Sequence, residues 1–183
     1  MNQVVERLYG HLGSDFERYR SHAEPLQLKA RGNVLIIGPG EFFEELALIE
    51  QYITNNQVQN IKIIGTNGMN ADLVMEQFHN HYKIPIEVSG SSYGYVFDTK
   101  PELTFDTIIY LGTPLSEPQD TFNYLAEHLN IGGKAYFTVN AFQLPEPTPE
   151  VKNCSIKIID NIPTNPNYHM VDFYYGVVIE KIK

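Results

Sequence analysis

The passage NVLIIGPGEFFEELALIEQYI is the feature that most constrains the fold of this chain. Its first part, NVLII (33–37), is the continuous apolar run expected of a strand buried in a parallel sheet. The turn GPG (38–40) interrupts the run, and EFFEELALIEQYI (41–53) then spaces its apolar residues along one face of a helix. A strand, a glycine turn and a helix in immediate succession predict an α/β unit with the turn at the carboxyl end of the strand.

The alternation of strand and helix patterns continues along the chain. Apolar runs predict further strands at 61–65, 84–90, 105–112 and 134–140, and helix patterns lie at 70–82 and 116–130. Such an alternation predicts a doubly wound, mostly parallel α/β sheet with helices on both faces.

The last part of the chain breaks this alternation. The proline-rich segment 141–153 has the composition of a loop, and strand patterns at 154–160 and 170–182 follow with no helix pattern between them. Strands that follow one another without a crossover helix pair in antiparallel fashion. We therefore expect an antiparallel pair to close the edge of a seven-stranded sheet.

Composition and charge argue against several classes of protein. The 183 residues suit one domain, and a net charge of −9 without any run of Lys and Arg argues against a nucleic-acid partner. Cys154 is the single cysteine, so neither a disulfide nor a multi-cysteine zinc site is predicted. The start of the chain lacks a secretory pattern, and no apolar run is long enough to span a bilayer. We expect a soluble cytoplasmic protein with no membrane partner.

Five short motifs, taken in order, resemble those of the class I (Rossmann-like) S-adenosylmethionine-dependent methyltransferases. They are VLIIGPGEF (34–42), IIGTN (63–67), VSGSS (88–92), FDTIIYLG (105–112) and LAEHLNIGGKAYFTV (125–139). The resemblance extends from about Asn33 to Lys183. It implies the strand order 3-2-1-4-5-7-6 with the last strand antiparallel, transferase activity, and S-adenosylmethionine as cofactor.

The resemblance also suggests how one domain over residues 1–183 is organised. Residues 1–30 are expected to form a helical segment that acts as a lid, because N-terminal helices cover the cofactor in many relatives. A Rossmann-like core is expected over 33–140, and the closing antiparallel pair over 154–183.

The expected cofactor site follows from the strand ends, where open parallel sheets bind their ligands. The first turn corresponds to the one that cradles the methionine part of the cofactor, and Asn67 is the candidate ribose contact. Asn67 is read equally well as a turn residue before Gly68. The candidate cofactor-binding residues are Gly38, Pro39, Gly40, Glu41, Asn67, Gly68, Ser91, Ser92 and Leu111.

The acidic residues after the first turn favour one kind of ligand. A phosphate at this helix start would face Glu41, Glu44 and Glu45, whereas the sulfonium and amino groups of S-adenosylmethionine are cationic. Glu41 is the candidate contact for those cationic groups. The alternative is that the glutamates only solvate the helix start and favour its dipole, which we expect for Glu44 and Glu45.

Four positions depart from the usual family pattern. Ile36 and Ser91 stand where acidic residues are common, Asn67 replaces the acidic residue that holds the ribose, and Phe42 replaces a third glycine. These departures favour the alternative of a methyltransferase-like pseudoenzyme that serves as an interaction or structural module.

Catalytic residues are harder to assign, because methyl transfer to a nucleophilic acceptor needs alignment more than acid–base chemistry. The candidates for a general base are His128, His169 and Asp172. No metal site is predicted, since His79 and His81 would point to different faces of a helix. The bare size of the expected core suggests a small-molecule acceptor, or a homodimer that completes the site.

Overall fold

The computed structural model describes residues 13–39, 44–65, 79–80, 82–89, 104–111, 118–140, 144, 146–162 and 174–183. The elements in these residues are α2 (Gly13–Leu26), β1 (Gly32–Ile37), α3 (Glu44–Thr54), β2 (Val58–Ile64), β3 (Ile86–Ser89), β4 (Phe105–Tyr110), α5 (Pro118–Glu127), β5 (Leu129–Asn140), β6 (Cys154–Ile162) and β7 (Tyr174–Lys181).

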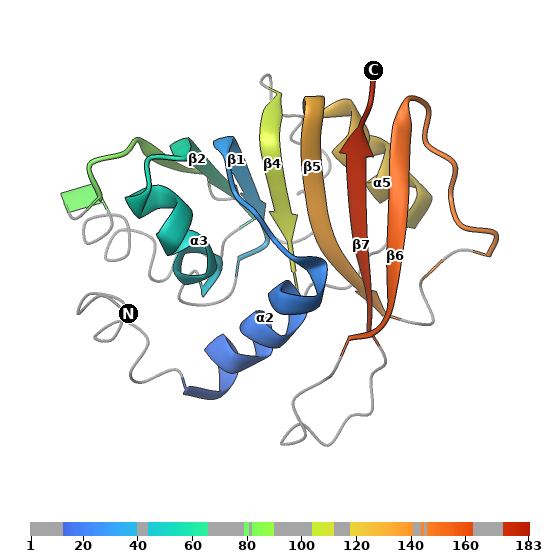
Figure 1. Cartoon of the computed structure of the whole chain (residues 1–183), viewed down its shortest axis with the longest axis horizontal. Helices are drawn as coiled ribbons and strands as arrows, with labels where there is room; N and C mark the ends of the chain where they lie inside the picture. Colours follow the sequence, from blue (N-terminus) through green and yellow to red (C-terminus); the bar gives the residue numbers. More distant parts are fainter. Residues whose placement is uncertain are drawn as a thin grey trace.

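The strands form one seven-stranded sheet in the order β3-β2-β1-β4-β5-β7-β6 (Figure 1). Strands β1 to β5 run parallel to one another. Strand β7 is antiparallel to both β5 and β6. The predicted doubly wound sheet, its strand order and its antiparallel closing strands are confirmed.

Alternate residues of the central strand β1 enter two different hydrophobic cores. Val34 and Ile36 belong to the core beneath α2 and α3, whereas Leu35 and Ile37 belong to the core beneath α5. All four side chains are fully buried. The strand is therefore apolar throughout because helices cover the sheet on both faces, as Figure 1 shows.

Helix α2 packs against α3, against β7 and against the edge strand β6. Its contact with β7 depends on Gly176, because a Cβ there would lie 2.7 Å from Leu26 Cδ2. The proposed role of residues 1–30 as a lid stays a prediction, since residues 1–12 lie outside the described part of the chain.

The end of α5 and the start of β5 differ from the sequence-based expectation. Helix α5 ends at Glu127 rather than Asn130, because the Phe105 N–H donates to the His128 carbonyl at 2.8 Å and Leu129 then pairs with Phe105. Strand β5 consequently includes both glycines that were expected to form a turn before it.

Strand β2 begins at Val58, three residues earlier than expected, where it pairs with Gly32 at the start of β1.

In the described part of the chain, no helix is long and apolar enough to cross a membrane.

Candidate cofactor site at the carboxyl edge of the sheet

Two glycines mark the carboxyl ends of the neighbouring strands β1 and β2. Gly38 has φ +55° and Gly65 has φ +79°, a region of backbone conformation that side chains with a Cβ disfavour. The Gly38 N–H donates to the Ile64 carbonyl at 2.9 Å, which holds the two turns at the same level. Gly38 and Gly65 thus form a pair of linked turns, called the step below, which fixes the backbone where both strands end.

Strand β4 ends beside this step. Ile36 of β1 pairs with Ile109 of β4, so continuing the parallel register brings Leu111 level with Gly38. Leu111 is fully buried, and Pro39 is also buried. The structure therefore brings together three of the predicted cofactor-binding residues: Gly38, Pro39 and Leu111.

The other candidates lie outside the described residues. They are Gly40, Glu41, Asn67, Gly68, Ser91, Ser92, His169 and Asp172. Phe42 also lies outside, and the assignment of a role to each of these residues stays a prediction.

His128 lies at the opposite edge of the sheet. Its carbonyl accepts the N–H of Phe105, the first residue of β4, whereas the candidate site lies where β4 ends. The buried His128 ring packs against Tyr124, with ring centroids 4.5 Å apart, and burial raises the pKa of Tyr124. The structure thus separates this candidate base from Gly38 and surrounds it with packing contacts.

Glu44 and Glu45 are buried, so the expectation that they solvate the helix start is wrong, whereas their place in the first turn agrees with the expectation that they favour the helix dipole. Their relative exposures are 1% and 0%, in the first turn of α3. Unpaired N–H groups and the helix dipole favour carboxylates at such a position. The sequence signal was available for Glu45, which precedes Ile49 by four residues and therefore shares the apolar face of the helix.

Ile36 explains why an acidic residue is missing from the end of β1. Its side chain is fully buried in the same core as Leu46 and Ile49 of α3. A carboxylate at this position would lie among apolar side chains, which is costly without a partner. The acidic residues that follow the turn are instead Glu44 and Glu45 in the first turn of α3.

Within the described residues, no group of three or more His, Cys, Asp or Glu side chains could hold a metal ion. In the described residues, the candidate site consists of the two glycine turns and buried apolar side chains, with Glu44 and Glu45 at the start of the helix that follows.

Comparisons with known proteins identify the fold. No family model and no curated protein matches the sequence. Among solved structures, an rRNA methylase from Streptococcus thermophilus is 11% identical with a TM-score of 0.55, covering 90% of this chain and 95% of its own. A protein described as a methyltransferase from Escherichia coli is 12% identical with a TM-score of 0.61, covering 92% of this chain and 86% of its own.

A protein described as a class I S-adenosylmethionine-dependent methyltransferase from Listeria monocytogenes is 11% identical with a TM-score of 0.60, covering 93% of this chain and 60% of its own. These similarities and the strand order agree. The chain has the class I methyltransferase fold. At this level of identity the similarity establishes the architecture of the methyltransferase fold and not a shared reaction.

The rRNA methylase corrects one expectation. We expect no nucleic-acid partner from the net charge of −9 without a run of Lys and Arg, and a small-molecule acceptor from the bare size of the core. The S. thermophilus chain has the same fold and is covered over 95% of its length, so a core of this size is found in a protein named for RNA methylation. Size therefore does not exclude a nucleic-acid acceptor, and the earlier exclusion was wrong.

Proposed function

We propose that this chain is an S-adenosylmethionine-dependent methyltransferase whose cofactor lies at the carboxyl edge of the sheet, against Gly38. The observation that carries this proposal is the paired step formed by Gly38 and Gly65, tied by the hydrogen bond from Gly38 to the Ile64 carbonyl. A ligand can approach the backbone closely there, because neither residue has a Cβ. Leu111 lies level with the step and is fully buried in the core beneath α2 and α3.

Charge supports this cofactor over a dinucleotide. Glu44 and Glu45 are buried at the start of α3, the helix that follows the step. A pyrophosphate bound at that helix start would approach two carboxylates in a poorly hydrated environment, which is unfavourable. S-adenosylmethionine has no phosphate and carries cationic groups, so the same charges favour it.

When bound, S-adenosylmethionine supplies an activated methyl group. The role of the protein is to hold that methyl group in line with an acceptor and to exclude water. Leu111 is an apolar neighbour suited to excluding water. The proposed base, where the acceptor is a hydroxyl, is His169 or Asp172. The printed names of the structural neighbours include an rRNA methylase, so the acceptor is left open between RNA and other classes.

The proposal is tested by methyl transfer from S-adenosylmethionine labelled in its methyl group. The purified chain is incubated with unmodified RNA and, separately, with a protein-free extract of small metabolites. We expect label to enter one of these pools with the wild-type chain. If the cofactor binds but neither pool is labelled, the catalytic part of the proposal is contradicted and a non-catalytic module remains.

A matched pair of glycine variants makes the test specific to the site. Gly38 and Gly132 both have positive φ, but Gly132 lies at the start of β5, at the opposite edge. Gly38→Ala and Gly132→Ala therefore introduce similar backbone strain. We expect Gly38→Ala to abolish transfer and Gly132→Ala to retain it, with far-UV circular dichroism confirming that both variants are folded.

A further inference from the structure

Strand β6 lies at the edge of the sheet and pairs with β7 on one side only. Its other side pairs with no strand in the described part of the chain. The backbone N–H and C=O groups of an edge strand form a template for one more strand. The pairing with β7 is regular from Cys154 to Ile159, so the side chains of these residues point alternately to the two faces of the sheet.

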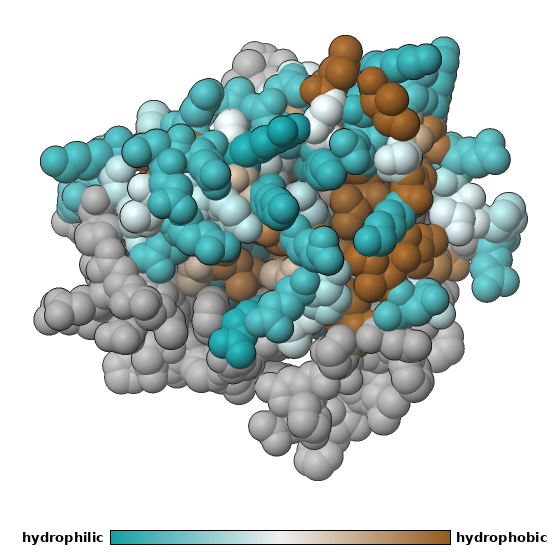
Figure 2. Space-filling model, viewed as in Figure 1, coloured by the Kyte–Doolittle hydropathy of each residue, from teal (hydrophilic) through white to brown (hydrophobic). Residues whose placement is uncertain are grey.

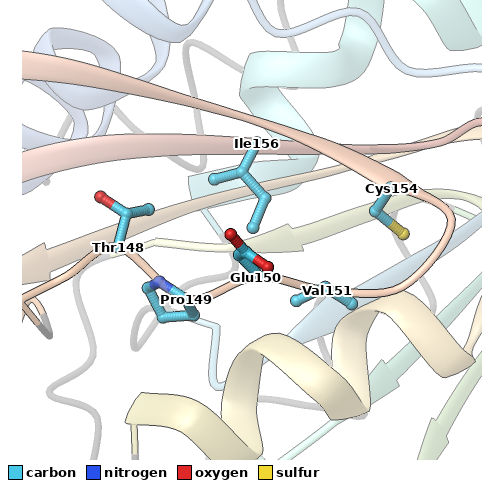
Figure 3. A pocket seen from close by; sticks show the side chains of 6 residues that line it. All are labelled: Thr148, Pro149, Glu150, Val151, Cys154 and Ile156. Atoms are coloured by element: carbon cyan, nitrogen blue, oxygen red, sulfur yellow. The ribbon is translucent and has the colours of Figure 1, made fainter.

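An open hollow of about 400 Å³ lies beside β6, on the face that α5 covers. Thr148, Pro149, Glu150 and Val151 line one side of it, and Cys154 and Ile156 line the other (Figure 3). In Figure 3 the segment 148–151 runs alongside β6, and the Ile156 side chain extends toward it. The connection from β5 to β6 has no helix pattern that would cover this part of the sheet.

The two faces of β6 differ in chemistry. Ile156 and Ile158 are half-buried on the face of the hollow, whereas Ser155 and Lys157 are exposed on the opposite face. Lys157 lies opposite Val178 of β7, and no carboxylate of the described residues forms an ion pair with it. Figure 2 views the sheet from the side of α2 and α3, the side of Lys157, and shows that apolar side chains gather there too over β6 and β7.

We propose that the outer edge of β6 binds an extended peptide segment of another protein in which apolar and acidic side chains alternate. The added strand pairs its backbone with Cys154–Ile159. Its apolar side chains enter the hollow beside Ile156 and Val151, and its acidic side chains lie beside Lys157 on the other face. Alternation of side chains along a strand makes both contacts compatible with one segment.

A second copy of this chain fits the edge less well. Self-pairing over the whole of β6 would centre on Ile158 and bring the two Lys157 side chains into diagonal positions on one face. No acidic residue would lie opposite them, because Lys157 would face Ile159. Charge complementarity therefore favours a different, acidic partner.

The test uses two short peptides, one of alternating valine and glutamate and one of alternating valine and lysine. The chain carries a net charge of −9, so general electrostatic attraction favours the lysine peptide, whereas the β6 edge favours the glutamate peptide. We expect the full-length chain to bind the glutamate peptide at least about threefold more tightly at an ionic strength of about 0.15 M. Backbone amide shifts are expected to change along Cys154–Ile159.

Charge-reversal variants provide the control. Lys157→Glu is expected to reverse the preference between the two peptides, and Lys83→Glu, an exposed lysine before β3, is expected to leave it unchanged. The proposal is overturned if the wild-type chain prefers the lysine peptide, if neither peptide binds, or if the shifts fall elsewhere. A dimer in which β6 amides are protected before peptide is added would also overturn it, in favour of a second copy.

Discussion

The Asp106 carboxylate accepts the backbone N–H of Asn33 at 2.9 Å, and so links β4 to β1 at the amino edge of the sheet. Its other oxygen accepts from the Asn130 side chain at 3.0 Å, which adds β5 to the same network. This edge lies opposite the candidate cofactor site. It joins three central strands by a single side chain and therefore serves stability.

Replacing Asp106 with Ala is expected to destabilise the chain without changing cofactor binding. Both hydrogen bonds are made to a carboxylate, and their loss is expected to lower the free energy of unfolding by about 2–3 kcal/mol. Urea denaturation measures this loss. Asp160→Ala, at an exposed position of β6, is the control and is expected to change stability by less than about 0.5 kcal/mol. Equal effects of the two substitutions would contradict the assigned role of Asp106.

Gly32 lies so close to the Asp106 side chain that no larger residue fits there without moving it. It has φ +58°, and a Cβ there would overlap Asp106 Oδ2, so Gly32→Ala must displace the carboxylate as well as strain the backbone. We expect a cost of roughly 2–4 kcal/mol. Gly132→Ala at φ +77° meets only Arg31 Nη2 at 3.6 Å and should cost about 1 kcal/mol.

A double-mutant cycle separates the two contributions to the cost at Gly32. In an Asp106→Ala background the carboxylate is absent and only the β-carbon of residue 106, 2.9 Å from the added Cβ, remains in the way, so Gly32→Ala should cost less than it does in the wild-type chain. Strict additivity of the two substitutions would show that Gly32 and Asp106 are not coupled.

Tyr82 gives a pH-dependent prediction. Its hydroxyl donates to Glu50 Oε1, and burial, this hydrogen bond and the Glu50 charge together raise the pKa of Tyr82 above its usual range. The unfolded chain releases the proton first as pH rises, so the stabilisation is present below pH about 10 and is lost above it. We expect Tyr82→Phe to be less stable than wild type at pH about 8, and the difference to narrow by pH about 11. Urea denaturation curves that stay equally far apart at both values would contradict this.

The sequence allowed the sheet to be predicted because its strands carry their own signal. Val34 to Ile37 are apolar on both faces of the strand, and the helix patterns that bury them alternate with the strand patterns along the sequence. The start of β2 was missed because Gln59 and Asn60 are polar, although Asn60 donates its side-chain amide to Asn33 Oδ1 at 2.7 Å. A hydrogen bond between residues far apart in the sequence cannot be predicted from the local pattern of apolar and polar residues.

The candidate site was only partly predictable for a similar reason. The glycine turn identified Gly38, because positive φ demands glycine locally. The position of His128 was missed, since its role depends on the pairing of Leu129 with Phe105, 24 residues earlier in the chain. The burial of Glu44 likewise depends on what packs over α3, whereas the burial of Glu45 could have been predicted from its spacing to Ile49 on the apolar face of the helix.

Glu41 carries the most specific prediction for the cofactor. We expect Glu41→Ala to weaken S-adenosylmethionine binding at least about tenfold, or about 1.4 kcal/mol, because the carboxylate is proposed to contact a cationic group. Glu127→Ala, an exposed residue at the end of α5, removes the same charge away from the site and is expected to leave affinity unchanged. Unchanged affinity in the Glu41 variant would remove this residue from the proposed site.

Calorimetric titration of the purified chain with S-adenosylmethionine, and separately with S-adenosylhomocysteine, tests the central claim most directly. We expect both ligands to bind with a dissociation constant near the micromolar range, a binding free energy of about 8 kcal/mol, and the Gly38→Ala variant to fail to bind. The absence of heat and of thermal stabilisation at about millimolar concentrations of either ligand would contradict it. The step formed by Gly38 and Gly65 would then be a feature of the fold without a cofactor.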